Sequence, residues 1–276
     1  MEWIAVRLRV TNPEWRDLLA AALIESGAAG VQEEIDGIST IVGSDVDLTK
    51  VRALAQTLAD DATLDTTSLG EVDWAGRWVP QVSVQRVGHI TIAPPWRRDE
   101  VADPAHAVLI EPAMAFGTGE HPTTRGCLRL MHGVIREGDF VADLGAGSAV
   151  LSIAAVRLGA ARVAAIESDP DAIGNAEANI ALNDVAGRVH VLLGDAADLL
   201  PLVAPVRVIV ANIIAPVLLQ LEPTMRASLA PEGRAILSGM LSSEREMMLD
   251  SFQTDGWRLL DEDAEGEWWS TVMTPA

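Results

Sequence analysis

The chain has 276 residues, of which 49% are hydrophobic, so it is long enough for one large or two modest domains with buried cores. Its 40 acidic and 20 basic residues give a formal charge of −20, which disfavours direct contact with nucleic acid and either attracts basic partners or serves solubility alone. We expect a cytoplasmic protein without a membrane span, because apolar runs are short, a signal-peptide pattern is missing and Cys127 is the only cysteine.

The first 70 residues predict a small ferredoxin-like domain. Their elements follow the order βαββαβ, with strands over 3–10, 30–34, 38–43 and 62–69 and helices over 13–26 and 47–60. Asp36-Gly37 is a typical hairpin turn between the second and third strands. Because this domain, 1–70, contains no cluster of catalytic residue types, we interpret it as a substrate-recognition module.

Residues 71–105 are predicted to form a linker with two short strands over 82–85 and 89–93, and Pro94, Pro95 and Pro104 after them indicate a stiff, largely irregular segment. From 106 to 276 the pattern is that of a parallel α/β sheet closed by a C-terminal hairpin. Strands are predicted over 140–144, 162–166, 189–193, 206–212, 234–238, 257–261 and 267–273, and helices over 148–158, 171–182, 214–229 and 243–254.

The sequence VADLGAGSAVL at 141–151 indicates a ligand-binding turn. An apolar strand runs into Gly145 and Gly147, and a helix follows, so the backbone can approach a ligand closely at a helix N-terminus. Glu167 ends the next strand, where its carboxylate can accept hydrogen bonds from both hydroxyls of a ribose. These three residues are candidate cofactor contacts.

Two residues distinguish this turn from a dinucleotide site. Val150 stands where a GxGxxG motif has its third glycine, and Asp143 would face a pyrophosphate unfavourably. A carboxylate at position 143 suits a ligand with a cationic amino-acid end, unless it only caps a turn. S-adenosylmethionine has that end together with a ribose, so we predict it as the cofactor and disfavour a nicotinamide-dependent oxidoreductase.

Two further strands end in polar residues at the edge where such sheets bind ligands. Asp195 either accepts from an adenine amino group or caps the following turn. Asn212 either caps a helix or offers an oxygen to an amine about to be methylated, which makes it the candidate catalytic residue.

The segment EPAMAFGTGEHPTT at 111–124 is a glycine- and threonine-rich loop that can close over a ligand. Phe116 is placed there either against the cofactor sulfonium or in the core. His121 is the nearest candidate for a general base, although a role in structuring the loop is favoured.

This loop, followed by DLGAG at 143–147, IESD at 166–169 and ANI at 211–213, resembles the PrmA family, the bacterial methyltransferases of ribosomal protein L11. The resemblance covers nearly the whole chain, and EGEW at 265–268 is similar to the end of that family. It implies a ferredoxin-like recognition domain, a linker and a class I, Rossmann-like methyltransferase domain over 106–276.

The resemblance also implies an activity, the transfer of methyl groups from S-adenosylmethionine to lysine side chains and the N-terminal amine of a basic large-subunit ribosomal protein. The cofactor contacts that it implies are Thr124, Gly145, Glu167 and Asn212. Two alternatives remain, a methyltransferase acting on the lysines of another protein and a catalytically silent binding module, which the complete set of motifs disfavours.

Overall fold

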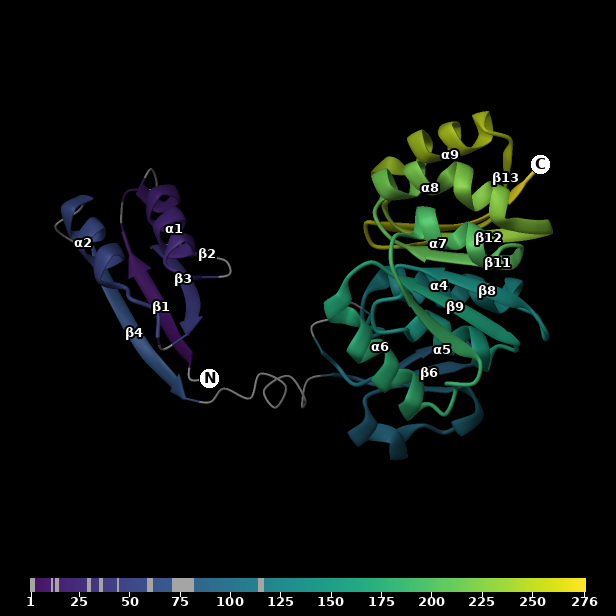
Figure 1. Cartoon of the computed structure of the whole chain (residues 1–276), viewed down its shortest axis with the longest axis horizontal. Helices are drawn as coiled ribbons and strands as arrows, with labels where there is room; N and C mark the ends of the chain where they lie inside the picture. The colour runs from purple at the N-terminus through teal and green to yellow at the C-terminus, as the bar shows by residue number, and fades with distance from the viewer. Residues whose placement is uncertain are drawn as a thin grey trace. The chain divides into compact units, whose positions relative to one another are not determined.

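The computed structural model describes residues 3–10, 12, 15–28, 31–34, 37–43, 45–58, 62–70, 82–113 and 117–276. The chain divides into two compact units, Met1–Arg77 and Trp78–Ala276, and each is described by itself (Figure 1).

The N-terminal unit is an antiparallel sheet covered by helices. Its elements are β1 (Trp3–Arg9), α1 (Arg16–Glu25), β2 (Gln32–Glu34), β3 (Gly37–Gly43), α2 (Thr49–Leu58) and β4 (Thr63–Gly70). The strand order β2-β3-β1-β4, with every neighbouring pair antiparallel, is that of a ferredoxin-like domain. Leu19 and Leu23 of α1 and Val51 of α2 pack with Val6 and Leu8 of β1 in one buried cluster. The predicted layout is therefore confirmed, although Asp36 of the hairpin turn lies outside the described residues.

The C-terminal unit is built on a seven-stranded sheet of order β10-β9-β8-β11-β12-β14-β13. The strands are β8 (Phe140–Leu144), β9 (Arg162–Glu167), β10 (Val189–Leu193), β11 (Val206–Asn212), β12 (Leu229–Leu241), β13 (Trp257–Glu265) and β14 (Trp268–Pro275). From β10 to β12 all neighbours are parallel, whereas β14 runs antiparallel to both β12 and β13. This arrangement confirms the predicted parallel α/β sheet with its C-terminal hairpin.

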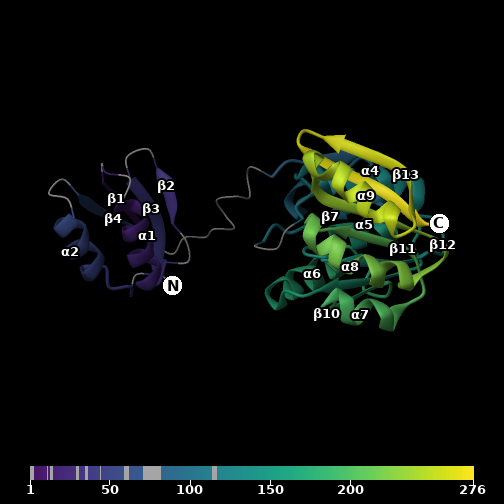
Figure 2. The same ribbon diagram turned by 90° about the horizontal axis from the view of Figure 1, so that it is seen from above.

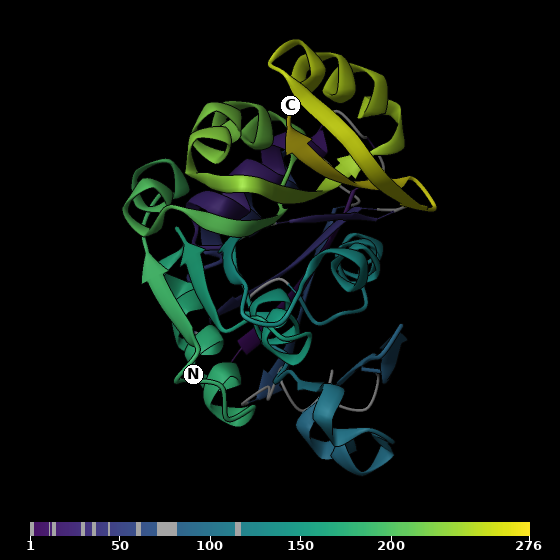
Figure 3. The ribbon, with the colours of Figure 1, turned by 90° about the vertical axis from the view of Figure 1, so that its right-hand side faces the viewer.

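Helices cover both faces of this sheet (Figures 2 and 3). One buried cluster joins the sheet to α4 (Pro122–Val134), α5 (Val150–Arg157) and α6 (Pro170–Leu182), and it includes the sole cysteine, Cys127. A second cluster joins the opposite face to α7 (Ala196–Val203), α8 (Ala215–Ser228) and α9 (Arg245–Thr254). Within β8, Val141 packs into the first cluster, whereas Ala142 and Leu144 pack into the second. Among the described residues, no helix combines the length and the apolar character needed to cross a bilayer.

A small second sheet precedes α4 in this unit. It consists of β5 (Gln85–Val87), β6 (Ile90–Ala93) and β7 (Ala107–Leu109), with the 3-10 segments η2 (Pro95–Glu100) and η3 (Pro104–His106) between the last two strands. The strand predicted over 82–85 is displaced toward the C-terminus, because only residue 85 of that range is in β5. The strands β5 and β6, which fall within the predicted linker 71–105, belong to the compact unit that begins at Trp78.

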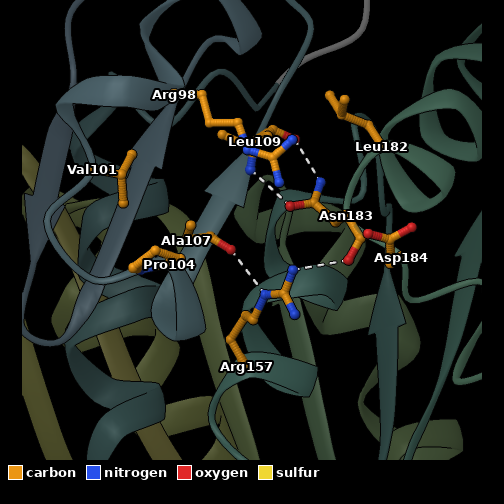
Figure 4. Close-up of a pocket in the computed structure, with 9 residues that line it drawn as sticks. All are labelled: Arg98, Val101, Pro104, Ala107, Leu109, Arg157, Leu182, Asn183 and Asp184. Atoms are coloured by element: carbon orange, nitrogen blue, oxygen red, sulfur yellow. Dashed lines mark hydrogen bonds between the residues drawn. The ribbon is translucent and has the colours of Figure 1, made fainter.

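Side chains from α5 and from the end of α6 hold this small sheet in place (Figure 4). Asn183 forms two hydrogen bonds to the backbone of Leu109, with its Oδ1 accepting at 2.8 Å and its Nδ2 donating at 2.6 Å. Arg157 donates through Nε to the carbonyl of Ala107 and through Nη2 to that of Asn183, each at 2.8 Å. Burial is the main cause that lowers the pKa of Arg157, with Arg188 adding to it. The small cavity in Figure 4, about 70 Å³, is lined by Arg157 and Asn183, and both side chains form hydrogen bonds that hold the backbone together.

Candidate active site

The carboxyl ends of β8, β9, β10 and β11 meet at one edge of the large sheet, the edge at which open α/β sheets bind ligands. A cavity of about 210 Å³ lies there. Its lining comes from the residues at or just after these strand ends and from α7 and α8, and includes Gly145, Ile166, Ser168, Asp195 and Ile213. Segments from Leu144 to Leu221, distant in the sequence, therefore converge on one place.

The turn after β8 needs glycine at two positions. Gly145 and Gly147 have φ angles of +70° and +53°, a region that side chains other than glycine adopt rarely. A Cβ at Gly145 would lie 2.8 Å from Cγ2 of Ile213, so the backbone here approaches its neighbour closely. Gly145 also donates its N–H to the carbonyl of Ile166 at 2.9 Å. The turn is thus held against the end of β9, immediately before α5 begins.

The Glu167 carboxylate links this turn to β9. It is buried, with Oε2 accepting from the N–H of Gly147 at 2.8 Å and Oε1 accepting from the N–H of Asp169 at 2.9 Å. Each carboxylate oxygen has two lone pairs, so both can accept one further hydrogen bond from a ligand hydroxyl. The structure therefore brings Gly145, Gly147 and Glu167 together.

Asp143 is a buried carboxylate with an incomplete set of partners. Its Oδ2 accepts from the hydroxyl of Ser152 at 2.6 Å, whereas Oδ1 has no hydrogen-bond partner among the described residues. Burial raises the pKa of Asp143 to about 6, against the lowering effect of Ser152. A ligand with a positively charged amine near this carboxylate would favour its ionised form. The unsatisfied oxygen and the close-approaching glycine turn fit the amino-acid end of S-adenosylmethionine.

Thr124 and Asn212 come from distant parts of the sequence and meet at this edge. Thr124 is buried in the first turn of α4, and its Oγ1 accepts from Nδ2 of Asn212 at 3.4 Å. Asn212 is the last residue of β11 and is half-buried. Since the structure shows no hydrogen bond to Oδ1 of Asn212 within the described part of the chain, this oxygen is available to a ligand.

The loop before α4 is fastened to the glycine turn. The hydroxyl of Ser148 donates to the carbonyl of Gly117 at 2.7 Å. His121 caps α4, with Nδ1 accepting from the N–H of Thr123 at 3.4 Å and lying 2.8 Å from its hydroxyl. Burial, followed by the charge of Arg125, lowers the pKa of His121. Both contacts with Thr123 lie in the first turn of α4, as the favoured loop-structuring role predicts. Phe116 lies outside the described residues, so its place at the cofactor stays a prediction.

Asp195 serves as a helix cap in this structure. Its Oδ1 accepts from the N–H of Ala197 at 2.7 Å, which satisfies a backbone group at the start of α7. Because Asp195 also lines the cavity, the cap does not exclude a contact with an adenine amino group.

An ionic cluster that the sequence patterns did not predict connects α4, and the loop before it, to the end of β13. Arg125 and Arg129 of α4 bind Asp263 and Glu265 at the end of β13. Arg129 holds the Asp263 carboxylate through two hydrogen bonds of 2.7 and 2.6 Å, and Arg125 also donates to the carbonyl of Glu120. Hydrogen bonding by Arg125 lowers the pKa of Glu265 to about 2. Glu265 belongs to the EGEW segment noted in the sequence, but the sequence gives no sign of its pairing with Arg125, which lies 140 residues away.

Comparison with known proteins places the chain among methyltransferases. Residues 34–275 match the family model for the ribosomal protein L11 methyltransferase (PrmA). The chain is 32% identical to the ribosomal protein L11 methyltransferase of Pelotomaculum thermopropionicum, over 97% of each chain. It is 33% identical to the protein of the same name from Streptococcus pneumoniae strain JJA, covering 98% of this chain and 95% of that one.

Solved structures give the same grouping. A ribosomal protein L11 methylase from Lactobacillus delbrueckii subsp. bulgaricus is 28% identical with a TM-score of 0.62, covering 70% of this chain and 98% of that chain. A tRNA methyltransferase from M. jannaschii, 13% identical with a TM-score of 0.51 over 98% of this chain and 99% of that chain, is similar in fold alone.

Proposed function

The chain belongs to the ribosomal protein L11 methyltransferase (PrmA) family, and on this basis we propose that it transfers methyl groups from S-adenosylmethionine to amino groups of ribosomal protein L11. The proposed acceptors are lysine side chains and the N-terminal amine. The observation that carries the proposal is the convergence of a glycine turn, Glu167 and the unsatisfied Asp143 carboxylate at the end of β8, beside the end of β11 that bears Asn212.

Each end of the proposed cofactor has a counterpart in this arrangement. Glu167 would accept from the ribose hydroxyls, and Asp143 would face the ammonium of the amino-acid end. Gly145 and Gly147 supply the positive φ angles of the turn, which places backbone groups at the edge where the ligand would bind. Thr124 borders the same region through its contact with Asn212. When bound, the cofactor supplies an electrophilic methyl group on a sulfonium.

The protein must present a neutral amine to that methyl group. A lysine with a pKa of ~10.4 requires roughly 4–5 kcal/mol to reach its neutral form at pH 7. A partly desolvated site reduces this cost because it disfavours the ammonium. Oδ1 of Asn212 would accept a hydrogen bond from the amine and orient its lone pair, a contribution from positioning rather than from proton abstraction.

We assign recognition of the substrate to the N-terminal unit and location to the cytoplasm, where ribosomal proteins are made. The acidic chain would attract a basic ribosomal protein, and we propose that methyl transfer itself requires no nucleic acid.

The experiment that tests this function is incubation of the protein with labelled S-adenosylmethionine and purified, unmethylated ribosomal protein L11. We expect label on lysine side chains and on the N-terminal amine, located by mass spectrometry of peptides. The Asn212→Ala variant should bind the cofactor but transfer label more slowly. Label on other proteins of an extract but not on L11 would favour the alternative, a lysine methyltransferase with another substrate.

A further inference from the structure

The opposite edge of the large sheet holds a second, larger cavity of about 750 Å³. It lies where β11 and β12 begin, where β14 ends and where α8 ends, so it is separate from the candidate active site at the carboxyl edge. Four arginines line it, namely Arg207, Arg226, Arg234 and Arg258, with Glu232 as the one acidic side chain among the lining residues. This local charge is opposite to the charge of the whole chain, which has twice as many acidic as basic residues.

Strand register brings two of these arginines close together. Arg258 of β13 pairs with Thr274 of β14, and Ala235 of β12 pairs with Met273. Arg234, one residue before Ala235, is therefore in line with Thr274 and Arg258 across three neighbouring strands. Since neighbouring strands lie ≈ 4.7–4.9 Å apart, the Cα atoms of the two arginines are roughly 10 Å apart. Two long guanidinium side chains at that spacing can reach one anion.

The charges of the four arginines are not neutralised by carboxylates within the described part of the protein. Among the described residues, none of them forms an ion pair or a side-chain hydrogen bond, and Nη1 of Arg207 is buried without a partner. By contrast, Arg97, Arg125, Arg129 and Arg245 all pair with carboxylates. Arg226 is in the last turn of α8, where a cation is stabilised by the helix dipole, but Arg207, Arg234 and Arg258 are on strands. An unpaired guanidinium nitrogen that is buried is costly, so a ligand would stabilise this arrangement.

We propose that this arginine-lined cavity binds phosphate groups. Guanidinium groups match carboxylate and phosphate oxygens in geometry, and the excess of arginine over acidic side chains favours an anion with more than one charge. A compact phosphorylated molecule fits this description. The phosphodiester backbone of RNA offers the same chemistry, although the chain's net charge of −20 opposes the approach of a long polyanion.

The test is calorimetric titration of the full chain with pyrophosphate at low salt. We expect saturable binding at one site, weakened at least tenfold in the double variant Arg234→Gln/Arg258→Gln. Arg136→Gln, an exposed arginine away from the cavity, should bind as the unchanged protein does. A second double variant, Arg226→Gln/Arg258→Gln, alters only exposed side chains and should also weaken binding. Because it leaves the half-buried Arg234 unchanged, weaker binding by this variant cannot be caused by misfolding at Arg234.

Two further titrations identify the source of the phosphate. Binding of a labelled RNA oligonucleotide that is tighter than pyrophosphate at equal salt, and lost in the same variants, would assign the site to an RNA backbone. Weaker RNA binding would assign it to a small phosphorylated ligand. The proposal is overturned if pyrophosphate does not bind, if both double variants bind it unchanged, or if a poly-glutamate peptide binds the arginines more tightly.

Discussion

At the scale of single residues, Glu167 combines a structural task with its proposed role in binding. Its carboxylate receives the N–H groups of Gly147 and Asp169 and thereby holds the glycine turn against β9. The sequence identified Glu167 from its position at a strand end, but the two backbone contacts are visible only in the structure. Removing the side chain therefore affects the turn as well as the proposed ribose contact.

We predict that Glu167→Ala weakens S-adenosylmethionine binding by about 1.5–3 kcal/mol, the usual range for hydrogen bonds to a charged group. Calorimetry at neutral pH measures this directly. Glu177→Ala, an exposed carboxylate on α6, is the matched control and should leave the affinity unchanged. Equal affinities for Glu167→Ala and the unchanged protein would remove Glu167 from the site.

Asp143 gives a prediction about pH. Burial raises the pKa of its carboxyl from 3.8 to about 6, so between these values the folded protein holds a proton that the unfolded chain has released. The stability contributed by the protonated group is therefore complete below about pH 3.8 and is lost as the pH rises to about 6. Asp143→Asn keeps the neutral state at every pH.

Relative to the unchanged protein without cofactor, Asp143→Asn should therefore gain free energy of unfolding between pH 4 and pH 7, by roughly 3 kcal/mol from the 1.36 kcal/mol-per-unit rule. Urea unfolding across this range measures the difference. The exposed Asp250→Asn on α9 should show no such trend. A difference between Asp143→Asn and the unchanged protein that stays constant with pH would show that the carboxyl is ionised throughout.

At the scale of elements, most strands and helices of the large sheet were predictable because apolar strands alternate with amphipathic helices. The helix α7 was not predicted, since AADLLPLV at 196–203 is short and contains Pro201, which normally indicates a break. The strand β7 was not predicted for a similar reason, because it is only three residues long and directly follows the proline-containing segment η3. Thr124 and Asn212 were identified from the sequence independently of each other, and the 3.4 Å hydrogen bond between them is seen only in the structure.

The ionic cluster between α4 and the β13–β14 hairpin could not be predicted from the sequence, because its arginines and carboxylates are far apart along the chain and become neighbours only in the folded structure. We predict that Glu265→Gln destabilises the protein by about 1 kcal/mol at neutral pH, a modest value because these groups are partly exposed and screened by solvent. Glu267→Gln, in the same hairpin, should have a smaller effect, since Glu267 forms no ion pair with any residue that the structure describes.

The effect of Glu265→Gln should also depend on pH in a defined way. Arg125 lowers the pKa of Glu265 from 4.5 to about 2, so the stabilisation is present above pH 4.5 and is lost as the pH falls toward 2. Chemical unfolding of both proteins from pH 7 downward should show curves that converge in that window. Convergence already at pH 5 would mean that the ion pair contributes little.

At the scale of the whole molecule, the two units are proposed to divide the work. A truncated chain that begins at Trp78 contains every cofactor residue named above, so it should bind S-adenosylmethionine with an affinity close to that of the full chain. It should lose methylation of ribosomal protein L11, because the recognition unit is missing. Normal activity of the truncated chain on intact L11 would contradict this division.

The position of the cut matters for that experiment. Glu120 accepts from the N–H of Ser83 at 3.1 Å, and Gly119 lies so close to Ile92 that an added Cβ would be 2.6 Å from its Cδ1. A chain that begins at Ala102 lacks both contacts to the loop before α4. We therefore expect weaker cofactor binding from that shorter chain than from the one beginning at Trp78.

The acidity of the whole chain predicts how salt affects the encounter with the protein substrate. A net charge of −20 would steer a basic ribosomal protein toward the enzyme and raise the association rate. Salt suppresses this effect because the Debye length shortens to about 3 Å at 1 M. Cofactor binding depends on local contacts and should respond less. We therefore expect the KM for the protein substrate to rise across a salt series while S-adenosylmethionine affinity stays nearly constant. If both quantities change alike, or if the KM does not change, the acidity serves solubility and steering plays no part.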